Sequence, residues 1–90
     1  MVEKEKVKWL EVITTELPIG YSKGDYQGRI YGITKSAFNN GKSFKVYAEE
    51  LGGKDFISLN LYLTNEGAVL KPCEMPEQKV KSLLNEMRRR

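Results

Sequence analysis

The chain has 90 residues, 40% of them hydrophobic, and a formal net charge of +3, which predicts one small domain over residues 1–90 with a limited core. It lacks the run of about 18 apolar residues that a membrane span needs, and the charged residues 1–6 lack the apolar core of a signal peptide, so we expect neither membrane insertion nor export. The chain has no histidine, so the commonest general base and metal ligand are missing, and we expect neither a metal site nor a cofactor. Its one cysteine cannot form an internal disulfide, which indicates a cytoplasmic protein.

The first predicted element is a helix over residues 3–17. Pro18 cannot continue the helical hydrogen bonds, so the helix ends before it. Large aromatic side chains mostly pack in cores, and we expect Trp9 to pack on the sheet rather than to bind a ligand. The apolar residues that recur at steps of three and four, the spacing of one helix face, are Val7, Leu10, Ile13 and Leu17.

Residues 18–28 predict a loop between this helix and the sheet, because glycines stand at positions 20, 24 and 28. Its side chains Tyr21, Lys23 and Tyr26 leave two interpretations open. They belong to a mobile connection, or they contact a phosphate or a base. We favour the mobile connection, since loops of this composition are common.

Residues 28–75 predict four consecutive strands joined by tight turns. Asn-Gly and Gly-Gly steps between β-rich segments are strong hairpin signals, because glycine and asparagine adopt positive φ at low cost. Turn sequences of this kind stand at 39–42, 52–54 and 65–67. They separate four segments, which are Arg29 to Phe38, Ser43 to Leu51, Asp55 to Thr64 and Ala68 to Cys73.

Side-chain alternation assigns the faces of these strands. In the first strand Tyr31, Ile33 and Lys35 share a side, and we expect a bulge near Gly32. In the second and third strands, the residues expected to face the core are Phe44, Val46, Ala48, Ile57, Leu59, Leu61 and Leu63. The residues expected to face outward are Lys45, Tyr47, Glu49, Phe56, Ser58, Asn60 and Tyr62.

The last predicted element is a helix that begins at Pro76, where the missing N–H costs nothing. Its apolar stripe is formed by Val80, Leu83, Leu84 and Met87. The arginines at 88–90 then have two interpretations. They complement the negative end of the helix dipole, which we prefer, or they contact phosphates, because guanidinium groups attract anions.

Basic and acidic residues are segregated along the chain. Residues 18–47 and 79–90 each carry a net charge of +4, while residues 48–78 carry −4. This segregation is explained either by a basic patch for an anionic partner or by an ordinary solvated surface.

Two short motifs do not predict catalysis. Gly41-Lys42-Ser43 resembles the end of a phosphate-binding P-loop, but Ser36 stands where that motif requires glycine, and the context is a hairpin. Cys73 precedes a predicted helix, yet the chain has no histidine to act as its base. We therefore expect a non-enzymatic protein without catalytic residues, and a thiol-dependent reductase using Cys73 ranks third among our hypotheses.

Together these elements predict an α+β fold: a four-stranded antiparallel β-meander with an N-terminal and a C-terminal helix packed on one face, in the order α-β-β-β-β-α. The outward face of the sheet is the candidate site, because aromatic side chains stack on bases and cations contact phosphates of single strands. The same aromatic side chains are equally suited to a homodimer interface. The predicted nucleic-acid-binding residues are Arg29, Tyr31, Lys35, Lys45, Tyr47 and Tyr62.

This pattern resembles the domain of the transcriptional coactivator positive cofactor four, and it is similar in layout to Whirly and purine-rich-element-binding proteins. The resemblance covers about residues 29–87. It implies a homodimer that binds single-stranded nucleic acid on its β-surface, with Arg29, Lys35 and Lys45 as contacts. The segments that carry it are Tyr31–Lys35, the turn Asn40-Gly41-Lys42, the strand through Tyr47 to Glu50, and Gly67–Pro72 before the last helix.

A second resemblance, carried by Ala48–Ser58 and Lys71–Pro76, is to short bacterial proteins labelled peptide methionine sulfoxide reductase. The Gly-Cys-Phe-Trp stretch of that enzyme is absent, and no second cysteine is present to resolve an oxidised Cys73. The leading hypothesis is therefore a small binding module for single-stranded nucleic acid. The alternative is a protein-interaction or structural module.

Overall fold

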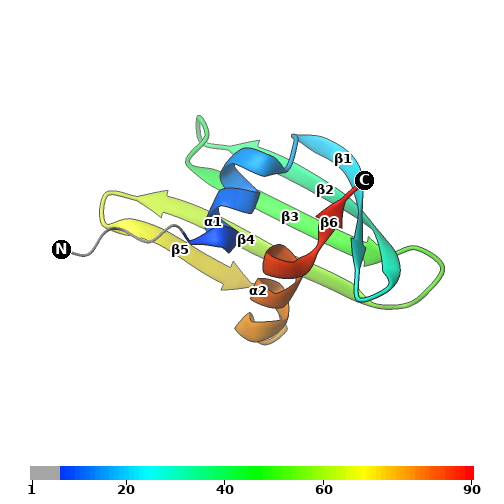
Figure 1. Cartoon of the computed structure of the whole chain (residues 1–90). Helices are drawn as coiled ribbons and strands as arrows, with labels where there is room; N and C mark the ends of the chain where they lie inside the picture. The colour runs from blue at the N-terminus through cyan, green and yellow to red at the C-terminus, as the bar shows by residue number, and fades with distance from the viewer. Residues whose placement is uncertain (1–6) are drawn as a thin grey trace.

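The structure, a computed structural model, describes residues 7–90 and consists of one sheet and two helical regions (Figure 1). The helical elements are α1 (Lys8–Glu11), the π-helical turn η1 (Val12–Glu16) and α2 (Glu77–Glu86). The strands are β1 (Gly20–Tyr26), β2 (Arg29–Phe38), β3 (Ser43–Glu50), β4 (Phe56–Thr64), β5 (Gly67–Pro72) and β6 (Arg88–Arg89).

Within the described residues the sheet has six strands in the order β5-β4-β3-β2-β1-β6, and all neighbouring strands are antiparallel. The predicted four-stranded meander is therefore wrong, although helices and an antiparallel sheet are both present. The four expected strands correspond to β2–β5 and differ from the predicted bounds by one residue at most. The two additional strands, β1 and β6, extend the sheet beyond β2.

The expected loop at residues 18–28 is mostly strand β1, which pairs with β2 from Gly20 opposite Lys35 to Tyr26 opposite Arg29. A tight turn connects the two strands, and its φ angles are positive, 53° at Gln27 and 76° at Gly28. The glycine at position 24 allows neighbouring atoms to pack closely against this part of β1. A Cβ atom at Gly24 would lie 3.3 Å from the carbonyl oxygen of Arg88 in β6, closer than side chains normally approach a neighbouring strand.

The predicted C-terminal helix is confirmed over its central residues but not at its ends. Pro76 is extended and precedes α2, and the helix ends at Glu86. The next residues turn back as β6, where Arg88 lies opposite Asp25 and Arg89 opposite Gly24. The arginines thus lie beyond the last turn of the helix rather than within it.

The N-terminal helical region spans α1 and η1 and ends at Leu17, which is extended and precedes Pro18. The part of the predicted helix at residues 3–6 lies outside the described residues. Trp9 is partly buried and packs against the hydrophobic core, which agrees with a packing role. The Lys81 amine lies 5.3 Å from the centre of its ring, within range of a cation–π contact.

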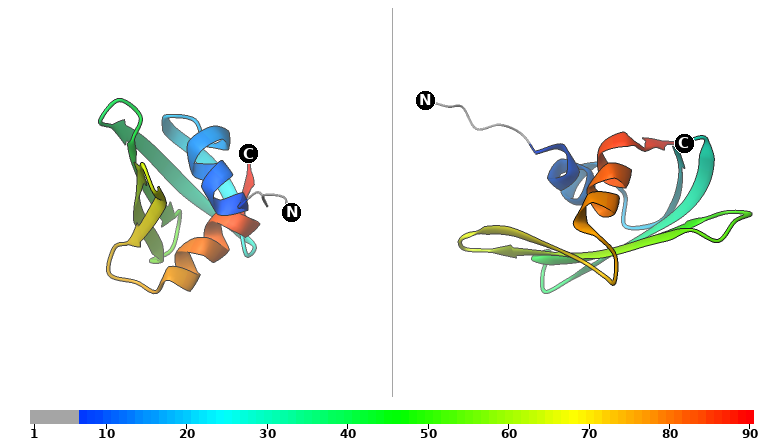
Figure 2. Two further views of the ribbon diagram at one scale, coloured as in Figure 1. Left: turned by 90° about the vertical axis from the view of Figure 1, so that its left-hand side faces the viewer. Right: turned by 90° about the horizontal axis from the view of Figure 1, so that it is seen from below.

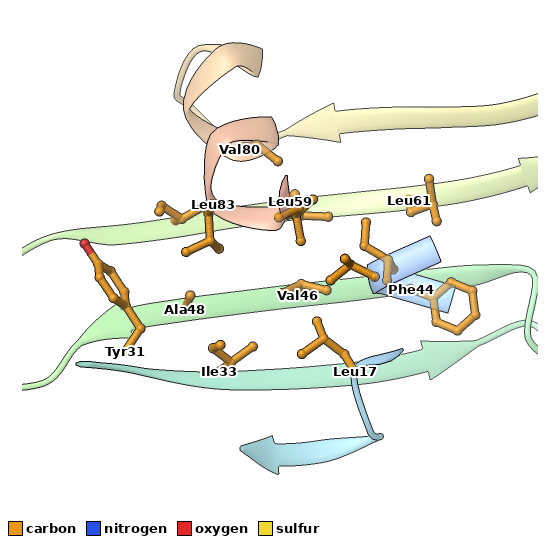
Figure 3. Packing of buried hydrophobic residues seen from close by; sticks show 14 of the residues in the cluster. Leu17, Tyr31, Ile33, Phe44, Val46, Ala48, Leu59, Leu61, Val80 and Leu83 are labelled. Carbon is orange, nitrogen blue, oxygen red and sulfur yellow. The ribbon is translucent and has the colours of Figure 1, made fainter. Parts of the chain in front are cut away.

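Both helical regions lie on one side of the sheet, and the edge of the sheet formed by β1 and β6 curls toward them (Figure 2). The core fills the space between the two layers (Figure 3). The predicted inward residues of β3 and β4 are buried, except that Leu63 is only partly so. The helical regions contribute the buried residues Val12, Ile13, Leu17, Val80, Leu83 and Leu84.

Strand β2 runs without the bulge expected near Gly32, because its pairing with β3 is continuous from Tyr31 opposite Glu50 to Phe38 opposite Ser43. The glycine has another explanation. A Cβ atom at Gly32 would lie 2.5 Å from the hydroxyl oxygen of Tyr21, so the Tyr21 ring lies against this position from the neighbouring strand.

The candidate binding face of the sheet

The candidate site is the side of the sheet that faces away from α1 and α2, which we call the open face (Figure 2). Alternation along each strand decides which side chains lie there. Because Val46 and Ala48 are buried in the core, their neighbours Lys45 and Tyr47 must point to the open face. The larger side chains assigned to the open face by this register are Tyr21, Lys23, Phe38, Lys45, Tyr47, Glu49, Phe56, Tyr62, Val69 and Lys71.

Aromatic side chains lie side by side on the open face. Tyr47 and Phe56 are stacked, with ring centres 6.1 Å apart and ring planes inclined by 30°. The row that contains Tyr47 continues through Thr34 to Tyr21 on β1. The exposed fractions of these side chains are large for aromatic residues: 38% for Tyr47, 43% for Phe56 and 57% for Tyr21.

A polar row separates two apolar rows on the open face. Lys45 lies between Ser36 on β2 and Asn60 on β4, and Asn60 in turn lies opposite Lys71 on β5. The row on the far side of Lys45 contains Phe38, Ser43, Tyr62 and Val69. Each lysine therefore has aromatic or aliphatic side chains in the next row, and the amines are accessible to an anion.

Three of the six predicted site residues, Lys45, Tyr47 and Tyr62, lie together on the open face. Tyr31 and Lys35 do not, since both lie on the opposite, helix-covered face and are only 2% and 4% exposed (Figure 3). Their predicted place beside Lys45 and Tyr47 is wrong, because both side chains are buried on the face that the helices cover. Arg29 shares their side of β2, is exposed at the strand end, and forms an ion pair with Glu50 at 3.4 Å.

The buried lysine has a structural role. The amine of Lys35 donates a hydrogen bond of 2.8 Å to the carbonyl oxygen of Leu17, where η1 ends, and lies 5.0 Å from the centre of the Phe44 ring. Burial lowers the pKa of Lys35, because the charged form loses hydration. This contact fixes the end of the helical region on the sheet.

The buried tyrosine belongs to a hydrogen-bond network that joins three elements. The hydroxyl of Tyr31 donates a 2.7 Å hydrogen bond to Asp55, and the amine of Lys79 on α2 donates one of 2.6 Å to the other carboxyl oxygen. The hydrogen bond from Lys79 is the main cause that lowers the pKa of Asp55. Burial is the main cause that raises the pKa of Tyr31, and the Asp55 carboxylate adds to it. The network connects α2 to the β3–β4 turn.

The open-face residues that the sequence did not place there are Tyr21, Lys23, Phe38, Val69 and Lys71. Tyr21 and Lys23 were missed because both were assigned to a loop. A signal for them exists, because the residues at 21, 23 and 25 alternate with Ser22, Gly24 and Tyr26 before the Gln27-Gly28 turn. Three glycines in eleven residues obscured that alternation.

Other kinds of site are not found in residues 7–90. These residues enclose no pocket and contain no cluster of three or more possible metal ligands. The thiol of Cys73 is partly buried and accepts a 3.5 Å hydrogen bond from the amide of Asn60. In the same part of the chain, neither helical region is long and apolar enough to cross a membrane. The open face is therefore the strongest candidate for function.

No protein-family model, curated protein or solved structure matches this chain.

Proposed function

We propose that this protein is a small non-enzymatic module that binds single-stranded nucleic acid through the open face. The observation that carries the proposal is the exposed aromatic group of Tyr47, Phe56 and Tyr62 beside Lys45 on a sheet surface that no described element covers. Large aromatic side chains are rarely left in water without a partner, and a group of them on one face is typical of an interaction site.

The chemistry of the open face suits an unpaired strand. Each base has a flat face that stacks on an aromatic ring, and stacking contributes about 1–3 kcal/mol per base. Lys45 and Lys71 lie in one row, two strand spacings apart, which is about 10 Å. Their amines supply phosphate contacts between the aromatic rows, and such contacts do not depend on base sequence.

A titration tests this proposal. A fluorescent single-stranded oligonucleotide of about 20 nucleotides, longer than one small domain is expected to cover, is titrated with the protein while its anisotropy is followed. We expect Tyr47→Ala to weaken binding by about 1–3 kcal/mol and Lys45→Ala to weaken it and reduce its dependence on salt. Lys8→Ala is the matched control, since Lys8 is an exposed lysine on α1, on the other side of the sheet. Equal affinity of all four proteins would refute the proposal.

A second candidate is self-association through the same face, with the homodimer as the functional unit. It is favoured by the apolar row of Phe38, Tyr62 and Val69, which would be buried between two sheets. Sedimentation equilibrium distinguishes the two candidates. A dimer that persists at high salt and dissociates in Tyr62→Ala supports self-association, whereas a monomer that binds the oligonucleotide supports the first proposal.

A further inference from the structure

The edge of the sheet formed by β1 and β6 carries a basic group that adjoins the open face. We propose that this edge, through Lys23 and Arg88, binds the phosphates of the single strand while its bases stack on the aromatic rows. This inference rests on the proposed function and adds to it a path for the backbone of the ligand.

The register of β6 places two of the three arginines on the open side. Arg88 lies opposite Asp25, and the backbone N–H of Arg90 donates a 2.9 Å hydrogen bond to the carbonyl oxygen of Lys23. Lys23 and Asp25 belong to the open side of β1, so Arg88 and Arg90 share that side. Arg89 alternates to the other side, where its guanidinium donates a hydrogen bond to the carbonyl oxygen of Glu16 in η1.

The charges at this edge remain positive after internal pairing. Asp25 is the one acid among the four side chains, and the Nε atom of Arg90 binds its carboxylate at 2.8 Å. Lys23 and Arg88 are exposed. Their charges are therefore available to an anion, and the guanidinium of Arg88 is suited to a bidentate phosphate contact.

The edge is continuous with the aromatic surface. Lys23 lies opposite Gly32, and Tyr21, two residues along β1, has its ring against the same glycine. The Tyr21 row then leads through Thr34 to Tyr47. A single-stranded nucleic acid whose bases stack on Tyr21 and Tyr47 therefore has phosphates that reach the basic edge within one or two nucleotides of the stacked bases.

Charge complementarity over the whole open side favours a polyanion as the occupant. An isologous contact with a second copy would bring these positive side chains toward one another, which is unfavourable unless anions separate them. An acidic peptide matches the charge but leaves the aromatic rows without a specific partner. The basic side chains are Lys23, Lys45, Lys71, Arg88 and Arg90, and the acidic ones are Asp25 and Glu49.

The test measures how oligonucleotide affinity depends on salt. The slope of log K against log salt is negative, and removing one phosphate contact to a single strand reduces its magnitude by about 0.7. We expect this change in Arg88→Gln and in Lys23→Gln, recovery of the slope in Arg88→Lys, and no change in Lys8→Gln, which removes the same charge from the helical side. Circular dichroism checks that each variant folds.

The outcomes separate the two proposals. If Tyr47→Ala weakens binding but the slope is the same in Arg88→Gln, Lys23→Gln and the native protein, the basic edge is refuted and the open face stands. If neither Tyr47→Ala nor Arg88→Gln affects binding, both proposals fail. Equal affinity for polyglutamate, or for a duplex of the same length, would overturn the assignment of the edge to an unpaired strand.

Discussion

At the scale of single residues, Lys35 and Lys45 show how the same side chain serves opposite purposes on adjacent strands. Lys35 is 4% exposed and holds the carbonyl of Leu17, whereas Lys45 is exposed on the open face. Alternation within each strand distinguishes the two faces, but it does not say which face the helices cover. For this reason the sequence placed Lys45 correctly and placed Lys35, together with Tyr31, on the wrong side.

The buried lysine leads to a prediction about stability. Lys35→Ala leaves the carbonyl of Leu17 without its donor in a buried position, which costs about 1–3 kcal/mol. Lys45→Ala is the matched control, and as an exposed substitution it changes stability by about 0.5 kcal/mol at most. Urea unfolding followed by circular dichroism compares the two variants. Equal unfolding midpoints would show that the contact between Lys35 and Leu17 contributes nothing.

At the scale of elements, strands β2–β5 were predictable because β2, β3 and β4 each end in a turn sequence with Asn-Gly, Gly-Gly or Glu-Gly, and β5 follows the last of these turns. Strand β1 was not predictable, because its glycines indicate a loop, whereas in the fold Gly24 lies close to the backbone of β6. Strand β6 has two residues and no period of its own. It forms only because α2 ends beside β1, and this is a tertiary effect that a local pattern does not contain.

The network of Tyr31, Asp55 and Lys79 predicts how the docking of α2 depends on pH. Because the pKa of Asp55 is lowered in the folded protein, its ion pair stabilises the fold above the ordinary carboxyl pKa of 3.8, and this contribution is lost as the pH falls through the lowered value. Asp55→Asn should therefore destabilise the protein near neutral pH and make stability less dependent on pH in the acid range. Urea unfolding near neutral pH and in the acid range measures the stability of the variant and the native protein. A parallel dependence of stability on pH in the two proteins would contradict the prediction.

At the scale of the whole molecule, one layer of helices leaves the sheet with two faces of different chemistry. The covered face is mostly aliphatic and buried, while the open face has aromatic residues at 38–57% exposure and an excess of positive charge. The place of half of the predicted site residues on the open face, namely Lys45, Tyr47 and Tyr62, could be found from strand alternation alone. The basic edge could not, because its residues come from positions 23, 88 and 90 and meet only after β6 docks on β1.

The position of Trp9 has a practical consequence for spectroscopy. The chain has one tryptophan, which belongs to α1 and contacts Lys81 of α2, and both helices lie on the side of the sheet opposite the open face (Figure 2). When the indole is excited selectively, its emission should therefore change as the folded state is lost and remain nearly constant when an oligonucleotide is added. Tyrosine emission should be quenched by the same ligand, because Tyr21, Tyr47 and Tyr62 lie where its bases would stack. Folding and ligand occupancy can then be read in one cuvette through two separate fluorophores.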